Sequence, residues 1–183
     1  GLSVEHCSEC RLLKVACSCK YRPELTSEVE FCLLTHDSEF RKPTNTGRLI
    51  PDCLEPPRIF NRHRTAPDPR LLEYIANPKY QHWLVFPAED SAQVDRIKPF
   101  EFAAGKKAAF ILLDATWQQA SKMFRRSPYL NNLPILSFNP QRLSQYSLRR
   151  ASKEHHLCTV EIAVELLNLV GEQHNARVLE DYF

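Results

Sequence analysis

Glycine is scarce in this chain, with only four residues among 183, and no glycine-rich loop of the kind that holds a dinucleotide or a nucleoside triphosphate occurs. Long apolar runs are also absent: none approaches the roughly 18 residues that a membrane-spanning helix needs, and no secretory signal is visible. Seven cysteines without a signal are typical of a reducing compartment. We therefore expect a cytoplasmic protein with no membrane partner.

Acidic residues are missing from positions 115–153, a window that holds seven lysines and arginines. Because the whole chain has a net charge of only +2, the rest of it is net negative. Such segregation is typical of a basic surface that contacts phosphates. A solvated helix face explains the same pattern equally well, so charge alone does not identify a partner.

Short, continuous apolar segments at 29–35, 82–87, 107–113 and 133–138 predict buried strands. Between them lie helical segments, including one that opens at Asp68-Pro69, where Asp caps and Pro occupies the first helical position. A strongly apolar helix is predicted over 159–170. This alternation indicates the α/β class, with a mostly parallel sheet covered by helices on both faces.

The most informative segment is Asp114-Ala115-Thr116-Trp117, which ends the apolar strand 107–113 and precedes a basic helix over 118–126. Ligands of open α/β sheets bind at the carboxyl ends of strands, where loops and helix N-termini converge. Asp114 is therefore a candidate site residue, although Asp114 or Thr116 could simply cap the helix while Trp117 fills core. The loop after Pro87 and the polar segment 139–153 also follow predicted strands, so all three segments could meet at one edge.

Four thiols lie within 13 positions, at Cys7, Cys10, Cys17 and Cys19. Two close pairs can form two turns around one tetrahedral Zn²⁺ ion, and so short a segment would need the metal to fold. The cluster predicts a structural zinc module over residues 1–27, with a redox dithiol or free thiols as alternatives. Cys32, Cys53 and Cys158 stand among apolar residues and are predicted to be buried thiols.

Taken together, these motifs resemble the DTW-domain family of tRNA-uridine aminocarboxypropyltransferases. The resemblance runs through the cysteine cluster, His36-x-x-Glu39 with 44–48, Phe86-Pro87, Asp114–Trp117, 146–149 and 159–161. Asp-x-Thr-Trp is its most specific element. The family pattern most often has Gly at the second place, where this chain has Ala115.

The resemblance implies that residues 28–183 form a DTW domain with a SPOUT-like fold, in which the C-terminal part of the sheet is knotted around the donor. It implies that S-adenosylmethionine gives its 3-amino-3-carboxypropyl group to N3 of a tRNA uridine and leaves methylthioadenosine. The residues that it places around the donor are Phe86, Pro87, Leu113, Leu136, Ser147, Arg149 and Thr159.

Asp114, Thr116 and Trp117 are the candidate catalytic residues. Because N3 must lose a proton, we expect Asp114 to act as the base or to orient it, with binding of the donor's ammonium group as the alternative. Thr116 could bind substrate or fix Asp114, Trp117 could stack on a base, and Arg149 could pair with the donor's carboxylate. Uridine N3 lies on the pairing edge, so the target base must be splayed out of a loop. The candidate RNA-binding residues are Arg41, Lys42, Asn45, Arg48, Lys122, Arg125, Arg126 and Arg150.

Two other function classes fit the sequence. A SPOUT-type RNA methyltransferase would use the same donor, and a zinc-containing RNA-binding protein would use the same basic surface. A ribosomal RNA substrate is a closer alternative. The sequence leaves the oligomeric state open, with a monomer slightly favoured.

Overall fold

The computed structural model describes residues 5, 7–8, 14–16, 25–36, 58–63, 66–86, 95–115, 117–137 and 159–182. Its centre is a five-stranded sheet in which all neighbouring strands are parallel. The strands, in spatial order, are β2 (Arg58–Arg62), β1 (Glu30–His36), β4 (Lys107–Asp114), β3 (Tyr80–Val85) and β5 (Ile135–Leu136). The predicted α/β class with a parallel sheet is confirmed.

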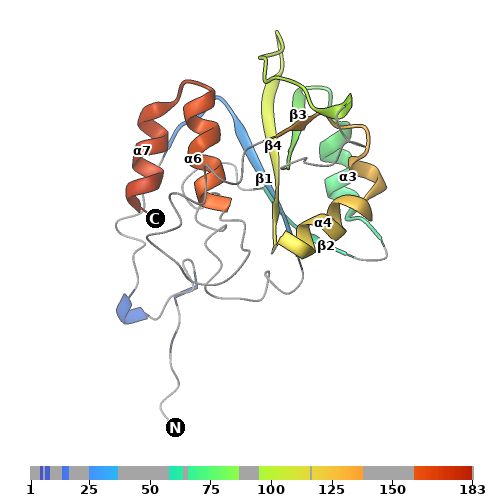
Figure 1. Ribbon diagram of the computed structural model, residues 1–183. Coiled ribbons are helices and arrows are strands. Elements are labelled where there is room, and N and C mark those ends of the chain that lie inside the picture. The colour runs from blue at the N-terminus through green and yellow to red at the C-terminus, as the bar shows by residue number, and fades with distance from the viewer. Residues whose placement is uncertain are drawn as a thin grey trace.

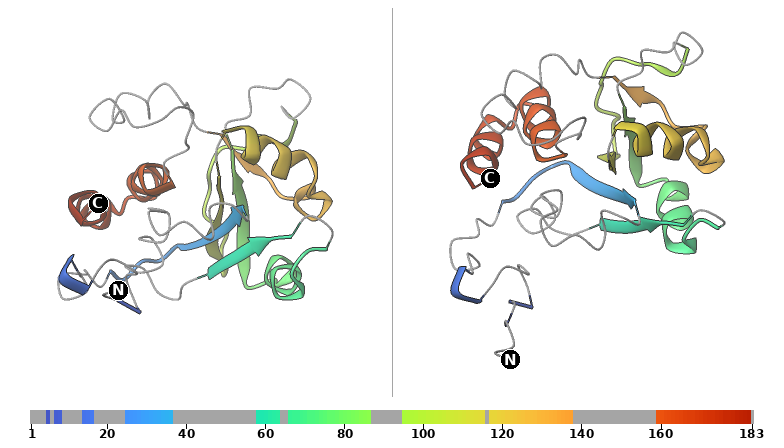
Figure 2. Two further views of the ribbon diagram at one scale, coloured as in Figure 1. Left: turned by 90° about the horizontal axis from the view of Figure 1, so that it is seen from below. Right: turned by 60° about the horizontal axis from the view of Figure 1, so that its bottom comes forward.

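Helices cover both faces of the sheet (Figures 1 and 2). One side carries α6 (Thr159–Leu169) and α7 (Gln173–Tyr182), and the other carries α3 (Pro69–Ala76) and α4 (Trp117–Arg125). Two short 3₁₀ turns, η1 (Lys14–Ala16) and η5 (Pro128–Leu130), complete the described elements. This layering explains why the middle residues of β1 and β4 form continuous apolar runs, since both faces of these strands are buried.

Side chains of β4 alternate between the two layers, as the pleat of a strand requires. Phe110 and Leu112 belong to the core beneath α6 and α7. Ile111 and Leu113 belong to the core on the other face, together with Met123 of α4. This alternation decides on which face each functional side chain lies.

Local signals account for the helix boundaries. Asp68 caps α3 by accepting a hydrogen bond from the Arg70 backbone N–H at 2.9 Å, with Pro69 at the first helical position, as predicted. After α6, Gly171 has a φ of +87°, a conformation that glycine adopts without strain, and the chain turns into α7.

The structure differs from the sequence prediction at several elements. The edge strand β2 and the helix α7 were not predicted, because β2 has only Ile59 and Phe60 between polar residues and α7 buries only Ala176 and Leu179 fully. Strand β3 begins two residues earlier than predicted, and β5 has only two residues. The helix predicted over 118–126 runs from Trp117 to Arg125.

Within the described part of the chain, no helix is both long and apolar enough to cross a membrane. The connection between β5 and α6 falls in residues 138–158, which lie outside the described residues, so the implied knot stays a prediction. Of the three cysteines predicted to be buried, Cys32 is confirmed; Cys53 and Cys158 lie outside the described residues.

Candidate functional site

Asp114 is the last residue of β4, and its neighbour across the ladder is Thr35 of β1. In a parallel sheet, residues that pair near the ends of two strands lie at the same edge. Asp114 lies on the same face of β4 as Phe110 and Leu112, and Thr35 on the same face of β1 as Phe31 and Leu33, because residues two apart in a strand share a face. These four apolar residues belong to the core beneath α6. The Asp114 side chain therefore lies at the carboxyl edge of the sheet, on the face that α6 covers.

Two threonine hydroxyls hold the Asp114 carboxylate. Thr35 Oγ1 donates to Oδ2 at 3.4 Å, and Thr159 Oγ1, from the first residue of α6, donates to Oδ1 at 3.2 Å. Both distances exceed the ~2.5–3.0 Å usual for O–H···O hydrogen bonds, so these are long contacts. The site thus joins three elements, β1, β4 and α6, through one side chain.

Burial and charge make this carboxylate unusual. Asp114 is 5% exposed, and Thr35 and Thr159 are buried with it. An ionised carboxylate is costly to bury unless donors or positive charge stabilise it. The two hydroxyls supply donors, and the N-terminus of α6 contributes a positive partial charge.

The other described residues that the family resemblance places around the donor divide between the two faces. Leu136 of β5 lies in the same core as the residues beneath α6, whereas Phe86 and Leu113 lie in the core on the α4 face. The ring of Phe86 stacks on Phe124 of α4, with centroids 4.5 Å apart. Thr159 therefore contacts Asp114, whereas Phe86 and Leu113 lie on the opposite face of the sheet.

Ala115, where the family usually has Gly, is buried in the core on the α4 face. The same cluster contains Leu113 and Ala120. The alanine side chain is therefore accommodated in a buried position.

Many predicted site residues lie in the part of the chain that the structure does not describe. Pro87, Thr116, Ser147 and Arg149 lie outside the described residues, as do the predicted RNA-binding residues Arg41, Lys42, Asn45, Arg48 and Arg150 and the predicted zinc ligands Cys10, Cys17 and Cys19. Trp117 opens α4, but its side chain is not described. Cys7 is half-buried, and the described residues around it contribute one exposed ion pair, Lys14 to Glu5 at 2.7 Å. No group of His, Cys, Asp or Glu in the described part of the chain could hold a metal ion.

A basic surface follows the carboxyl edge on the α4 side. Lys122, Arg125 and Arg126 are exposed there, and α4 contains no acidic residue. Arg62, at the end of β2, donates from Nη2 to the backbone carbonyl of Arg126 at 3.5 Å, which brings a fourth cation to the same place. Arg62 was missed by the sequence analysis because the strand that carries it was not predicted.

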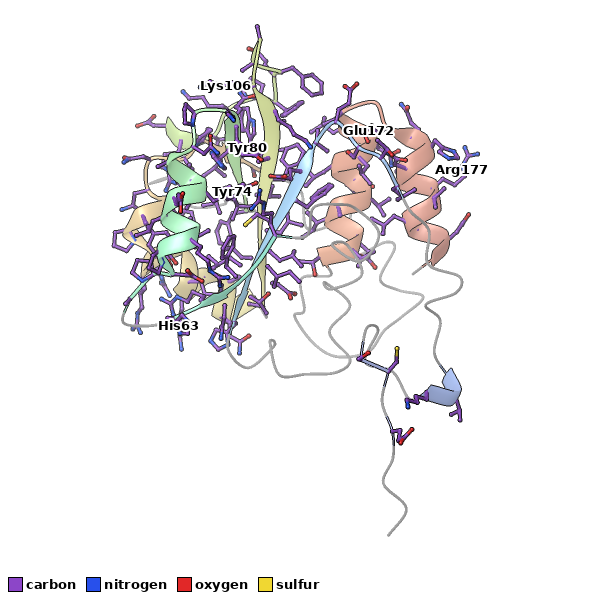
Figure 3. All side chains as sticks on the ribbon, turned by 180° about the vertical axis from the view of Figure 1, so that it is seen from behind. His63, Tyr74, Tyr80, Lys106, Glu172 and Arg177 are labelled. Carbon is purple, nitrogen blue, oxygen red and sulfur yellow. The ribbon has the colours of Figure 1, made fainter. Side chains whose placement is uncertain are left out.

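A second polar cluster, which the sequence analysis also missed, lies at the amino edge of the sheet. Glu30, the first residue of β1, accepts a hydrogen bond from the Tyr74 hydroxyl at 2.6 Å and faces Arg58 Nε at 3.9 Å. The rings of Tyr80 and His82 pack against Tyr74. Figure 3 shows Tyr74, Tyr80 and Lys106 at this end of the sheet and His63 at the other. The sequence feature that could have revealed this cluster is Glu30, a glutamate at the start of an apolar strand.

The groups around the Glu30–Arg58 pair in this amino-edge cluster are neutral. Burial, reinforced by Cys32 and Glu30, raises the pKa of the Tyr74 hydroxyl, and burial with Glu30 raises the pKa of the Cys32 thiol. Burial lowers the pKa of His82 to about 4, so its ring is neutral at pH 7. Neutral tyrosine, thiol and imidazole around one carboxylate paired with a guanidinium indicate a structural cluster.

Comparison with known proteins finds relatives that carry the name of one enzyme. It is 26% identical over 181 residues to tRNA-uridine aminocarboxypropyltransferase 2 of Drosophila melanogaster, covering 93% of this chain and 68% of the relative. Proteins of the same name from Mus musculus and Macaca fascicularis are each 24% identical, covering 96% and 92% of this chain but only 61% and 57% of their own lengths. No solved structure matches the chain.

The DTW domain matches residues 4–183, which is nearly the whole chain, and Asp114 with its two threonine partners lies inside the match. The chain belongs to the DTW-domain family.

Proposed function

We propose that this protein is a tRNA-uridine aminocarboxypropyltransferase that takes the 3-amino-3-carboxypropyl group from S-adenosylmethionine. The observation that carries the proposal is the DTW domain over residues 4–183, with relatives of that activity, and the motif's aspartate buried at the carboxyl edge of a parallel sheet. That edge is where α/β proteins bind small ligands.

The reaction is a substitution at carbon. Uridine N3 forms a bond to the γ-carbon of the donor, the bond from that carbon to sulfur breaks, and sulfur keeps the electron pair as methylthioadenosine leaves. The N3 proton passes to a base or to solvent. The protein therefore has to align N3, carbon and sulfur and to hold the ends of the transferred group, which carry an ammonium and a carboxylate.

Asp114 and Thr159 are assigned to the donor side of this site, with Leu136 on the same face of the sheet. Arg149 is assigned to the donor's carboxylate, because a guanidinium pairs with a carboxylate through two hydrogen bonds. Thr116 and Trp117 follow the Asp114 motif position in the sequence, with Trp117 as the first residue of α4, and are assigned to the target base.

The RNA is proposed to cross the carboxyl edge of the sheet. Its phosphates would lie along the basic surface of Lys122, Arg125, Arg126 and Arg62, which is on the α4 face, while the target uridine reaches over the edge toward Asp114 on the α6 face. A splayed base separated from its backbone track is the arrangement expected for chemistry on a loop nucleotide. Arg41, Lys42, Asn45, Arg48 and Arg150 are proposed to extend this track.

A zinc ion bound by Cys7, Cys10, Cys17 and Cys19 is proposed for the N-terminal module, residues 1–27. The support is the spacing of the thiols and the small number of apolar residues available to fold that segment without a metal. Metal analysis of the purified protein, beside a Cys7→Ser, Cys10→Ser variant, tests it: about one zinc per chain is expected, and it should be lost in the variant.

Donor labelled in two positions tests the reaction directly. Unmodified tRNA is incubated with S-adenosylmethionine carrying one isotope in the methyl group and another in the carboxyl group. The proposal predicts that only the carboxyl label enters tRNA and that the methyl label leaves in methylthioadenosine. Methyl label in tRNA would establish a methyltransferase instead. Carboxyl label in ribosomal RNA but not in tRNA would show that ribosomal RNA is the substrate.

A further inference from the structure

The segment 98–107, which leads into β4, carries an exposed aromatic ring at the amino edge of the sheet. Phe102 is 57% exposed, and it is the one aromatic residue among the large apolar side chains that the structure describes as exposed. Figure 1 shows the turn after Phe102, in yellow-green, projecting beyond the end of the sheet. Because β4 runs from Lys107 to Asp114, at about 3.3 Å per residue this turn lies roughly 23 Å from the Asp114 site.

The buried core holds the Phe102 ring in place. Its ring meets that of Phe100 edge to face, with centroids 4.9 Å apart and an interplanar angle of 78°. Phe100 in turn contacts the core rings of Trp83 and Phe110, each at 5.5 Å. In an edge-to-face pair, Phe100 covers at most one face of the Phe102 ring. The ring is therefore fixed and still presents aromatic surface to a partner.

Backbone hydrogen bonds fix the segment against β3. The Ala103 N–H donates to Gln81 Oε1 at 3.2 Å, and the Lys107 N–H donates to the Lys79 carbonyl at 3.0 Å. Gly105 has a φ of +74°, the left-handed conformation that this turn requires and that glycine adopts without strain. A segment that is already ordered loses little conformational entropy when it binds a partner.

Lysines surround the exposed ring. Lys79, Lys98 and Lys106 are exposed, and none of them takes part in an ion pair within the described part of the chain. Figure 3 shows Lys106 at this end of the sheet. Glu101 is the one acidic residue between positions 98 and 107, which hold three lysines. The local charge is therefore positive and available to an anionic partner.

This combination favours RNA over a protein partner. A stable protein interface buries about 800 Å² on each side, and lysine is depleted from such interfaces. Single-stranded nucleic acids are instead bound by aromatic rings on which bases stack, within a positively charged surface that contacts phosphates. Phe102 supplies the ring, and the three exposed lysines supply the charge.

We propose that Phe102, Lys79, Lys98 and Lys106 form a second RNA contact, in which an unpaired base of the substrate stacks on Phe102 and neighbouring phosphates contact the lysines. The proposal rests on the proposed function for the identity of the RNA as tRNA. A folded tRNA is longer than the distance between this surface and Asp114, so one molecule can contact both ends of the sheet. The second contact favours a folded tRNA over an isolated loop that reaches only the carboxyl edge.

Binding of fluorescently labelled, unmodified tRNA tests the stacking contact without any transfer reaction. Phe102→Ser should raise Kd by about 5- to 100-fold, the range expected for one base stacked on an aromatic ring. Phe102→Tyr keeps the ring and should stay within about twofold of the wild type. Leu169→Ser is the matched control, because Leu169 at the end of α6 is 54% exposed and has no ring. Equal weakening by Phe102→Ser and Leu169→Ser would overturn the stacking contact.

The salt dependence of the same binding reaction tests the lysines. Lys98→Gln and Lys106→Gln should each reduce the slope of log Kd against log salt concentration by about 0.7 to 0.9, as the loss of one phosphate contact predicts. Arg177→Gln removes the same charge from α7, across the molecule from Lys106 in Figure 3, and should keep the wild-type slope. Wild-type slopes in both lysine variants would overturn the phosphate contacts.

The outcomes separate this proposal from the proposed function. Transfer to tRNA, with wild-type affinity and slope in the Phe102 and lysine variants, would overturn the second contact and leave the function intact. The predicted losses of tRNA binding in a protein that transfers nothing would support the contact and overturn the function. Wild-type dimers that Phe102→Ser dissociates, with tRNA binding unchanged, would make the segment an interface between copies of this chain. Should Phe102→Ser not fold, the slopes of the lysine variants decide the question.

Discussion

Two carboxylates are buried in the same sheet at opposite ends, Glu30 at 3% and Asp114 at 5% exposure. Glu30 contacts a tyrosine hydroxyl at 2.6 Å and faces a guanidinium at 3.9 Å, within a shell of aromatic rings. Asp114 is held by two aliphatic hydroxyls at longer distances, at the edge where parallel strands end. Burial alone therefore does not identify a functional carboxylate; the chemistry of its partners and the end of the sheet do.

The largest expected effect comes from moving the carboxylate at the carboxyl edge without removing it. Asp114→Glu adds one methylene in a buried site held by Thr35 and Thr159, and a displacement of about 1 Å is expected to lower the transfer rate about 100-fold. Glu30→Asp, the matched change at the amino edge, should leave the rate per folded molecule within about twofold. Steady-state transfer to tRNA measures both, and a tolerant Asp114→Glu variant would contradict a precisely positioned site.

At the amino edge the effect should be on stability. Tyr74→Phe keeps the ring and removes the hydrogen bond to Glu30, which should cost about 2 kcal/mol in the free energy of unfolding because the acceptor is charged and buried. Chemical denaturation measures it, with Tyr129→Phe, a half-buried tyrosine of η5, as a matched control. If the two variants were equally stable, the Glu30 cluster would not be a structural unit.

His82 gives the amino edge a pH dependence. Burial holds its pKa at about 4 in the folded protein against an ordinary 6.5, so the unfolded chain binds a proton first as the pH falls. Its contribution to stability is complete above pH 6.5 and is lost between about 6.5 and 4.

After allowance for solvent screening, the loss of stability from His82 should be about 2 kcal/mol. His82→Gln, which cannot titrate, should flatten the curve of unfolding free energy over this pH range. A variant whose stability falls as steeply as that of the wild type would assign the dependence to other groups.

The smallest effect per residue is expected on the basic surface. Arg62→Gln and Arg125→Gln should each weaken tRNA binding and reduce the slope of log Kd against log salt concentration by about one, as the loss of one phosphate contact predicts. Arg70→Gln is the control, because Arg70 pairs with Asp68 at 2.9 Å. Equal slopes for all three variants and the wild type would contradict the proposal that RNA binds along the α4 face.

The sequence predicted the central part of the fold because its strands are buried on both faces and so read as short apolar runs. It predicted Asp114 as a site residue for the same reason, since a carboxylate that ends such a run is conspicuous. Edge strand β2 and helix α7 bury few side chains, and their patterns were too weak to predict.

Contacts between distant segments could not be predicted. Thr35 and Thr159 are 79 and 45 residues from Asp114 in the chain, and only the register of β1 with β4 and the docking of α6 bring them together. The Glu30–Tyr74 pair is separated by 44 residues in the same way. The sequence also did not predict on which face of the sheet a residue lies. Asp114 and the cations of α4 are close in sequence but lie on opposite faces of the sheet.

One paired measurement tests the contrast between the two carboxylates most directly. Asp114→Asn and Glu30→Gln are compared with the wild type for the rate of aminocarboxypropyl transfer per folded molecule and for the free energy of unfolding. For Asp114→Asn we predict a transfer rate lower by at least about 100-fold with little loss of stability. For Glu30→Gln we predict a clear loss of stability with little change in the transfer rate per folded molecule. Equal losses of transfer in the two variants, or transfer retained by Asp114→Asn, would contradict the assignment of the site to the carboxyl edge.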